Sequence, residues 1–150
     1  MSFFDAVISA FRKYFDFSGR ASRSEFWWFF LFCALLYLLT ISLSVREISQ
    51  INNMNPQELI TQFMMSWFGV AMVLTFIPSI SISVRRFHDI NMSGWWYAGL
   101  QILPSVLAQL MSIFSLISFM ALMVYLYFMC MKGGIENKYG ANPLNQEEEY

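Results

Sequence analysis

The chain has 150 residues and a net charge of −1; 57 % of the residues are hydrophobic, only 13 % are charged, and the mean hydropathy is +0.50. A soluble domain carries roughly 25 % charged residues, so this composition excludes an ordinary soluble domain, and the length allows one domain. The bilayer is the solvent that fits so much apolar surface.

The first segment, about residues 3–16, is predicted to be an amphipathic helix that does not span the membrane. Phe4, Ile8, Phe11 and Phe15 recur at spacings of four, three and four, which is the period of a helix with one apolar face. Two placements stay open, and they are compatible: the helix lies in the cytoplasmic membrane interface, or it packs on the rest of the protein.

The first predicted span covers about residues 25–45. Ser22 and Glu25 have the S-x-x-E spacing of a capping box, so a helix is expected to begin at Ser22. Residues 26–45 carry no charge, and twenty helical residues reach across roughly 30 Å of hydrocarbon. Trp27 and Trp28 stand at its entry, where interfacial indoles are expected.

The second predicted span covers about residues 63–84. Asn55 and Pro56 predict a helix that restarts at Pro56, since they have the pattern of an N-cap followed by proline at the first helical position. Pro78 lies inside the span and is expected to kink it, with nearby serines helping to satisfy the backbone groups that it frees.

No charged residue occurs from Trp95 to Met131, a run too long for one ordinary span. Pro104 and several polar residues near the middle favour a tight hairpin, with spans at about residues 94–110 and 112–131. The alternative is one strongly tilted helix with a re-entrant piece. Residues 132–150 form a polar tail whose acidic end is expected to be disordered.

The positions of the basic residues predict the topology. With four spans and both termini inside, eight of the nine Lys and Arg residues lie on the cytoplasmic side, and only Arg46 lies in an outer loop. The predicted fold is an all-α membrane protein: one domain with four transmembrane helices in two hairpins, plus an N-terminal interfacial amphipathic helix. The expected location is an inner membrane, with both termini in the cytoplasm.

Three stretches carry a family resemblance: FSGRASRSEFW from Phe17, RRFHD from Arg85 with SGWW from Ser93, and GIENKYG from Gly134 followed by Asn142 and Pro143. In this order they resemble the bacterial inner-membrane proteins grouped as domain of unknown function 805. The first loop and second span are longer than in compact members, and Phe87 stands where leucine is commoner. The resemblance implies a multi-pass inner-membrane protein and brings no reaction, substrate or cofactor.

All three stretches fall on the predicted cytoplasmic face, so their polar and aromatic side chains are expected in one interfacial layer. The candidate cluster is Arg20, Arg23, Glu25, Arg85, Arg86, His88, Asp89, Trp95, Trp96, Asn137 and Tyr139. One interpretation is structural: Arg85 and Asp89, four residues apart, pair on the helix, and Glu25 completes its capping box or meets an arginine. The other is a head-group or phosphate site, because arginine forks match phosphate oxygens.

No catalytic, cofactor or metal site is predicted. The sequence lacks HExxH, GxSxG, P-loop and CxxC patterns, and Cys33 and Cys130 lie in apolar runs as expected of packing residues. We expect a non-enzymatic membrane interaction or lipid-associated module; the alternative is a small transporter or channel subunit. The expected partners are membrane lipids with anionic head groups and a second copy or another membrane protein, and no nucleic acid.

Overall fold

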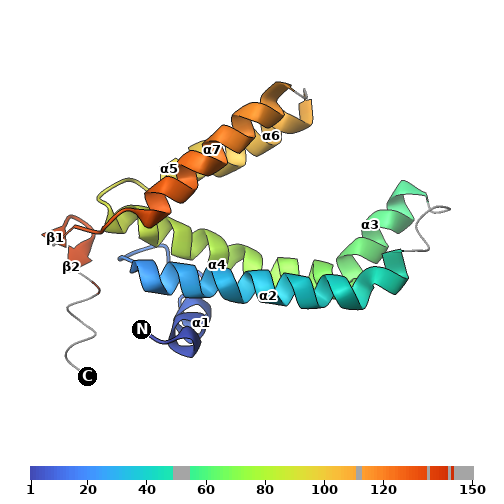
Figure 1. Cartoon of the computed structure of the whole chain (residues 1–150), viewed down its shortest axis with the longest axis horizontal. Coiled ribbons are helices and arrows are strands. Elements are labelled where there is room, and N and C mark those ends of the chain that lie inside the picture. Colours follow the sequence, from blue (N-terminus) through green and yellow to red (C-terminus); the bar gives the residue numbers. More distant parts are fainter. Residues whose placement is uncertain (49–54, 111–112, 135, 142, 144–150) are drawn as a thin grey trace.

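The computed structural model describes residues 1–48, 55–110, 113–134, 136–141 and 143. These residues form helices joined by short connections, with one small pair of strands (Figure 1). In chain order the elements are α1 (Phe3–Arg12), α2 (Arg23–Ile48), α3 (Pro56–Met65), α4 (Trp67–Asp89), α5 (Trp95–Tyr97), the π-helix η2 (Ala98–Ile102), α6 (Leu103–Leu110), α7 (Ile113–Cys130), β1 (Glu136–Asn137) and β2 (Gly140–Ala141).

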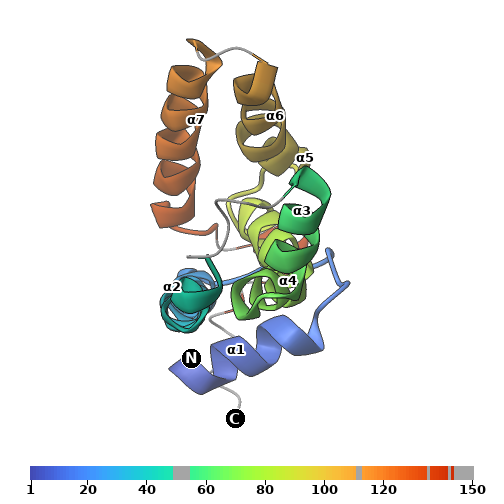
Figure 2. The same cartoon turned by 90° about the vertical axis from the view of Figure 1, so that its right-hand side faces the viewer.

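The long helices α2 and α4 lie side by side in opposite directions (Figures 1 and 2). α2 has 26 residues and α4 has 23, so each is longer than the roughly 30 Å of a hydrocarbon core. Both are long and apolar enough to cross a membrane, over Arg23–Ser44 and Trp67–Asp89. The chain is therefore mostly helical with two candidate membrane spans.

Small and hydroxylated side chains bring α2 and α4 together. Ala71 and Thr75 on α4 are buried, and the Tyr37 hydroxyl of α2 lies 2.6 Å from the Thr75 hydroxyl. Small residues that permit close approach, with a few polar side chains bonded across the contact, are typical of helix pairs in membranes.

The predicted second span begins four residues later than expected, because the helix breaks at Ser66. The Ser66 backbone is extended, with φ −67° and ψ 155°, and its side chain accepts a hydrogen bond from Gly69 N. Gly69 packs directly on the end of α3: a Cβ there would lie 2.1 Å from the Phe63 carbonyl oxygen. The helix predicted to run from Pro56 through the span is thus two helices, α3 and α4.

Pro78 is buried inside α4, and the helix continues past it. A proline has no N–H for the carbonyl four residues earlier, here that of Leu74. The Tyr14 hydroxyl donates to the Leu74 carbonyl oxygen at 3.2 Å, so a residue outside the helix supplies the missing hydrogen bond. The serines near Pro78 bond elsewhere: Ser79 donates to the Thr75 carbonyl and Ser83 to the Ser79 carbonyl.

Helix α1 lies across α2 and α4, so that Figure 1 looks along α1 and Figure 2 looks along α2. Its small residues Ala6 and Ala10 are buried, whereas Phe4 is 73 % exposed. Phe15, just beyond the helix, is 74 % exposed. A helix is present as predicted and packs on α2 and α4, although it ends at Arg12 and not near residue 16. Part of the apolar stripe that would enter the membrane interface is exposed.

The second half of the chain forms a helical hairpin. The run α5–η2–α6 packs along α7, and the pair extends away from α2 and α4 (Figures 1 and 2). The predicted hairpin is therefore present as a pair of helices. Pro104 was expected to favour the reversal between the two helices. It lies instead near the start of α6, just after the π-helix η2.

The start of the polar tail contains a small pair of strands that the sequence analysis did not predict. Residues 136–137 and 140–141 pair as two short antiparallel strands, with Asn137 opposite Gly140. Gly140 has φ +125°, which glycine tolerates and which lets the chain reverse between the strands. The predicted disordered acidic end lies outside the described residues.

Candidate functional site

The three sequence stretches meet at one end of the molecule, where α2 begins and α4 and α7 end (Figure 1). The segment before α2 lies against the end of α4, where Ala21 N donates to the Arg85 carbonyl at 3.1 Å. The segment after α7 lies there too, since Gly134 N donates to the Asp89 carbonyl at 3.1 Å. We call this the latch end, and the expected convergence is observed.

Five charged side chains form the centre of this end, and we call them the latch: Arg20, Glu25, Arg85, Arg86 and Asp89. All five are at most 6 % exposed. Charged groups are costly in such surroundings unless they are paired. Their partners therefore decide what the cluster can do.

Asp89 joins two arginines from different parts of the chain. Arg20 Nη2 lies 2.8 Å from one Asp89 carboxylate oxygen, and Arg20 Nε donates to the same oxygen at 2.9 Å. Arg86 Nη1 bonds to the other oxygen. One buried carboxylate thus holds the segment before α2 against the end of α4.

The same two arginines also hold the C-terminal segment. Arg86 donates through Nε to the Met129 carbonyl at 3.3 Å and through Nη2 to the Met131 carbonyl, which are acceptors that the end of α7 leaves open. Arg20 Nη1 donates to the Gly140 carbonyl at 2.9 Å. Gly133 permits the close approach, because a Cβ there would lie 2.1 Å from Asp89 Oδ2.

The second ion pair corrects an expectation. Arg85 does not pair with Asp89 but with Glu25 of α2, whose Oε1 lies 3.0 Å from Arg85 Nη1. Ser22 caps Glu25 N at 3.2 Å, as predicted. The Glu25 carboxylate meets Arg85 and accepts from Ser9 of α1 at 3.0 Å, so it joins three helices.

Arg85 is not fully satisfied by the described residues, since its buried Nε and Nη2 have no hydrogen-bond partner among them. A further charge that interacts with Arg85 is Asp16, in the turn between α1 and α2. Hydrogen bonds from Ser18 hold the pKa of Asp16 below its usual value, and Arg85 lowers that pKa further. The Asp16 carboxylate therefore stays ionised and offsets part of the excess positive charge.

His88 and Tyr139 form a stack on the latch end. Their ring centroids are 3.9 Å apart and the planes are nearly parallel, at 5°. His88 Nδ1 lies 3.1 Å from the Gly19 carbonyl oxygen, and Asn137 Nδ2 donates to the His88 carbonyl at 2.8 Å. The three residues serve to hold the terminal segments on α4.

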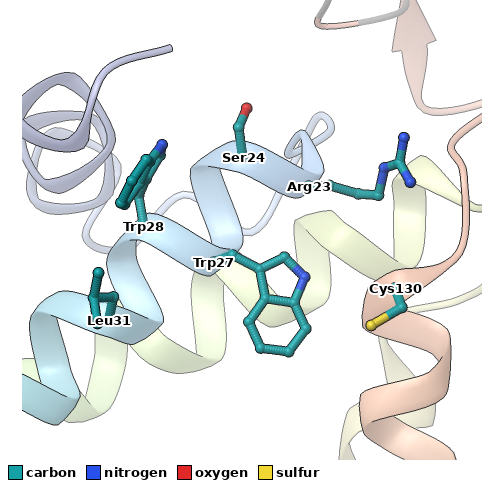
Figure 3. A pocket seen from close by; sticks show the side chains of 6 residues that line it. All are labelled: Arg23, Ser24, Trp27, Trp28, Leu31 and Cys130. Carbon is teal, nitrogen blue, oxygen red and sulfur yellow. The ribbon is translucent and has the colours of Figure 1, made fainter.

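Arg23 differs from the other arginines of the cluster. It is exposed and lines a groove of about 580 Å³ together with Ser24, Trp27, Trp28, Leu31 and Cys130 (Figure 3). Within the described ranges, no residue forms an ion pair or hydrogen bond with its guanidinium. Figure 3 shows it extending from the start of α2 toward the end of α7.

The remaining predicted residues lie at the margin. Trp95 is 83 % exposed and lines a second pocket beside His88, and Trp96, also exposed, is near Phe128. No group of three metal-ligating side chains occurs in the part of the chain that was described. Cys33 and Cys130 are both free thiols, the first buried and the second exposed.

Sequence reasoning found the charged residues but missed several of their partners. Ser9 and Tyr14 belong to a segment whose polar side chains were given no partners, and Gly133 carries no chemistry of its own. The main-chain carbonyls held by Arg20 and Arg86 have no sequence signal. The adjacent glycines Gly133 and Gly134, at the start of the third stretch, were a sequence hint that the C-terminal segment approaches another part of the chain closely.

One family model matches the chain over residues 14–141, and its description is "Protein of unknown function (DUF805)". This range includes the latch, the groove at Arg23 and the terminal strands. Neither a curated protein nor a solved structure matches the chain significantly.

Proposed function

The chain belongs to the DUF805 family, and we propose that it is a multi-pass, non-enzymatic inner-membrane module that binds anionic phospholipids at the Arg23 groove. The latch closes the cytoplasmic end of the helices, and the groove beside it takes a lipid phosphate. The observation that carries this proposal is the contrast between Arg23 and the buried arginines.

The membrane placement is supported by three apolar helices. Two of them are long and apolar enough to span. The third, Phe114–Cys130, is apolar but shorter, and a short span is accommodated by local thinning of the bilayer. In the proposed topology α2, α4 and both arms of the hairpin cross the membrane.

The orientation follows from the positive charges. Arg20, Arg85 and Arg86 meet at the latch end, and Arg12, Lys13 and Lys132 belong to the segments next to it. Basic residues near the ends of spans favour the cytoplasmic side. With the latch end inside, the exposed apolar stripe of α1 lies near the same interface, where it can enter the acyl region.

The groove suits a phospholipid because its lining changes from polar to apolar. Arg23 offers forked donors for phosphate oxygens. The Ser24 hydroxyl lies 3.0 Å from Ser22 Oγ, and it adds another donor when it accepts from Ser22. Trp28 and Leu31 follow along α2, where an acyl chain would lie. Arg20, Arg85 and Arg86 do not take this role, because each is buried away from the groove and paired with a buried carboxylate.

The test compares the same Arg-to-Gln substitution at two positions, one inside the groove and one outside it. Arg23→Gln removes the proposed phosphate contact, and Arg12→Gln removes an exposed charge on α1 outside the groove. We expect co-purified phosphatidylglycerol, counted by native mass spectrometry, to fall roughly tenfold in the first variant, the equivalent of about 1.4 kcal/mol, and to change little in the second.

Cys130 provides an independent readout, since its exposed thiol lines the groove whereas Cys33 is buried. Phosphatidylglycerol in the bilayer should slow maleimide labelling of Cys130 relative to a purely zwitterionic bilayer, and Arg23→Gln should remove that protection. Equal lipid retention and equal labelling in wild type and Arg23→Gln would refute the proposed site.

A further inference from the structure

A second pocket, of about 550 Å³, lies between α4 and the α5–η2 run and shares no lining residue with the proposed phosphate site. Ile80, Val84 and His88 form one wall, spaced four residues apart along a single face of α4. Ala98 and Ile102, at the two ends of the π-helical turn, belong to the opposite wall. The slot therefore runs from a polar rim at His88 into an apolar interior.

The rim presents a defined hydrogen-bond acceptor. A carbonyl oxygen only accepts, so the contact of His88 Nδ1 with the Gly19 carbonyl assigns the proton of the neutral imidazole to Nδ1. Nε2 is then the acceptor. It lies beside Gly94, where a Cβ would be 3.4 Å away, and Gly94 is itself part of the lining.

The rim also presents a donor. Ser93 Oγ accepts from Trp95 N at 3.4 Å, which leaves its own hydroxyl proton available. Both residues line the slot, and the ring of Trp95 is mostly exposed. None of the residues that line this slot is Arg, Lys, Asp or Glu, in contrast to the groove at Arg23.

We propose that this slot binds an uncharged ring amphiphile of the quinol class. One ring hydroxyl donates to His88 Nε2, and a second ring oxygen accepts from the Ser93 hydroxyl. The ring packs against the aromatic side chains at the rim, and the hydrocarbon tail extends along Val84 and Ile80. The volume lies within the range of small-molecule sites, roughly 300–1,000 Å³.

The hydrogen-bond pattern separates this ligand from ionised lipid head groups. A fatty-acid carboxylate or a phosphodiester has no donor for Nε2 and meets no arginine in the lining. An oxidised quinone also lacks the donor, because both of its ring oxygens are carbonyls. The slot is therefore expected to prefer the reduced ring, and no electron transfer by the protein is involved.

The test uses the full chain in nanodiscs of zwitterionic lipid, titrated anaerobically with a decyl benzoquinol and followed by calorimetry against empty nanodiscs. Ala98→Leu fills the slot and should weaken binding at least tenfold, about 1.4 kcal/mol. Ala108→Leu makes the same change on α6 outside the slot and should leave binding unchanged.

Two milder variants examine the hydrogen bonds. Ser93→Ala and His88→Asn, the latter keeping a donor near Gly19, should each weaken quinol binding severalfold, about 1 kcal/mol, and reduce the preference for quinol over quinone. Arg23→Gln should not alter quinol binding, so the two proposed sites fail or succeed separately.

Clear results would overturn the assignment. Binding that persists in Ala98→Leu would place the quinol outside the slot, and the absence of saturable binding to wild type would remove the proposal. Equal affinity for quinol and quinone, or tighter binding of decanoate than of quinol, would show that the head group is of a different chemical class.

Discussion

At the scale of single residues, Asp89 links three segments of the chain. Its carboxylate is buried, accepts from both Arg20 and Arg86, and leaves no room for a Cβ on Gly133. Those two arginines in turn hold carbonyls of the C-terminal segment. A change at Asp89 therefore reaches three separate segments.

Amide substitutions should rank the carboxylates by the number of arginines that they neutralise. Asp89→Asn leaves two buried guanidinium groups uncompensated and Glu25→Gln leaves one. Losing one partner of a buried pair costs about 3–5 kcal/mol, so both variants should unfold earlier in denaturant, Asp89→Asn first. Glu136→Gln, an exposed carboxylate on β1, should stay within about 0.5 kcal/mol of wild type.

Equal stability of the three variants would mean that the latch is not buried as described. Of the three pairings behind the expected ranking, only that of Arg86 with Asp89, three residues apart on α4, follows a local rule. The i,i+4 spacing of Arg85 and Asp89 predicted a pair on one helix, but Glu25 is brought closer to Arg85 by the packing of α2 on α4. The sequence indicated which side chains belong to the latch end, whereas their ion-pair partners depend on tertiary contacts.

At the scale of helices, α4 illustrates both the reach and the limit of sequence patterns. Pro78 was correctly placed within the helix, and its missing N–H was foreseen. The group that bonds the orphaned carbonyl is Tyr14, sixty positions from Leu74 in sequence, which no local pattern identifies. The break at Ser66 was missed because hydropathy does not distinguish one long apolar helix from two.

A double-mutant cycle tests the link between Tyr14 and Pro78. Tyr14→Phe should cost about 1 kcal/mol of stability, since it leaves the Leu74 carbonyl without a donor. In a Pro78→Ala background the new backbone N–H can bond that carbonyl, so the same substitution should cost distinctly less. Thermal unfolding in one detergent would give the coupling energy; an identical cost in both backgrounds would contradict the assignment.

At the scale of the whole molecule, most of the fold class was predictable and the placement of its parts was not. Apolar runs located the helices, and the three polar stretches correctly indicated a common end. The outward extension of the α5–α7 hairpin (Figure 1) and the positions of the two pockets depend on packing alone. Self-association through the exposed helical faces stays a prediction.

Cysteine accessibility in intact cells tests most directly whether the latch end faces the cytoplasm and the hairpin crosses the membrane. In a background without Cys33 and Cys130, we would label Asn91→Cys, in the exposed turn after α4, and Leu110→Cys, at the exposed end of α6. An impermeant maleimide should label position 110 from outside and position 91 only after permeabilisation. Labelling of position 91 from outside, or protection of position 110, would contradict the proposed topology and remove the basis of the phosphate site.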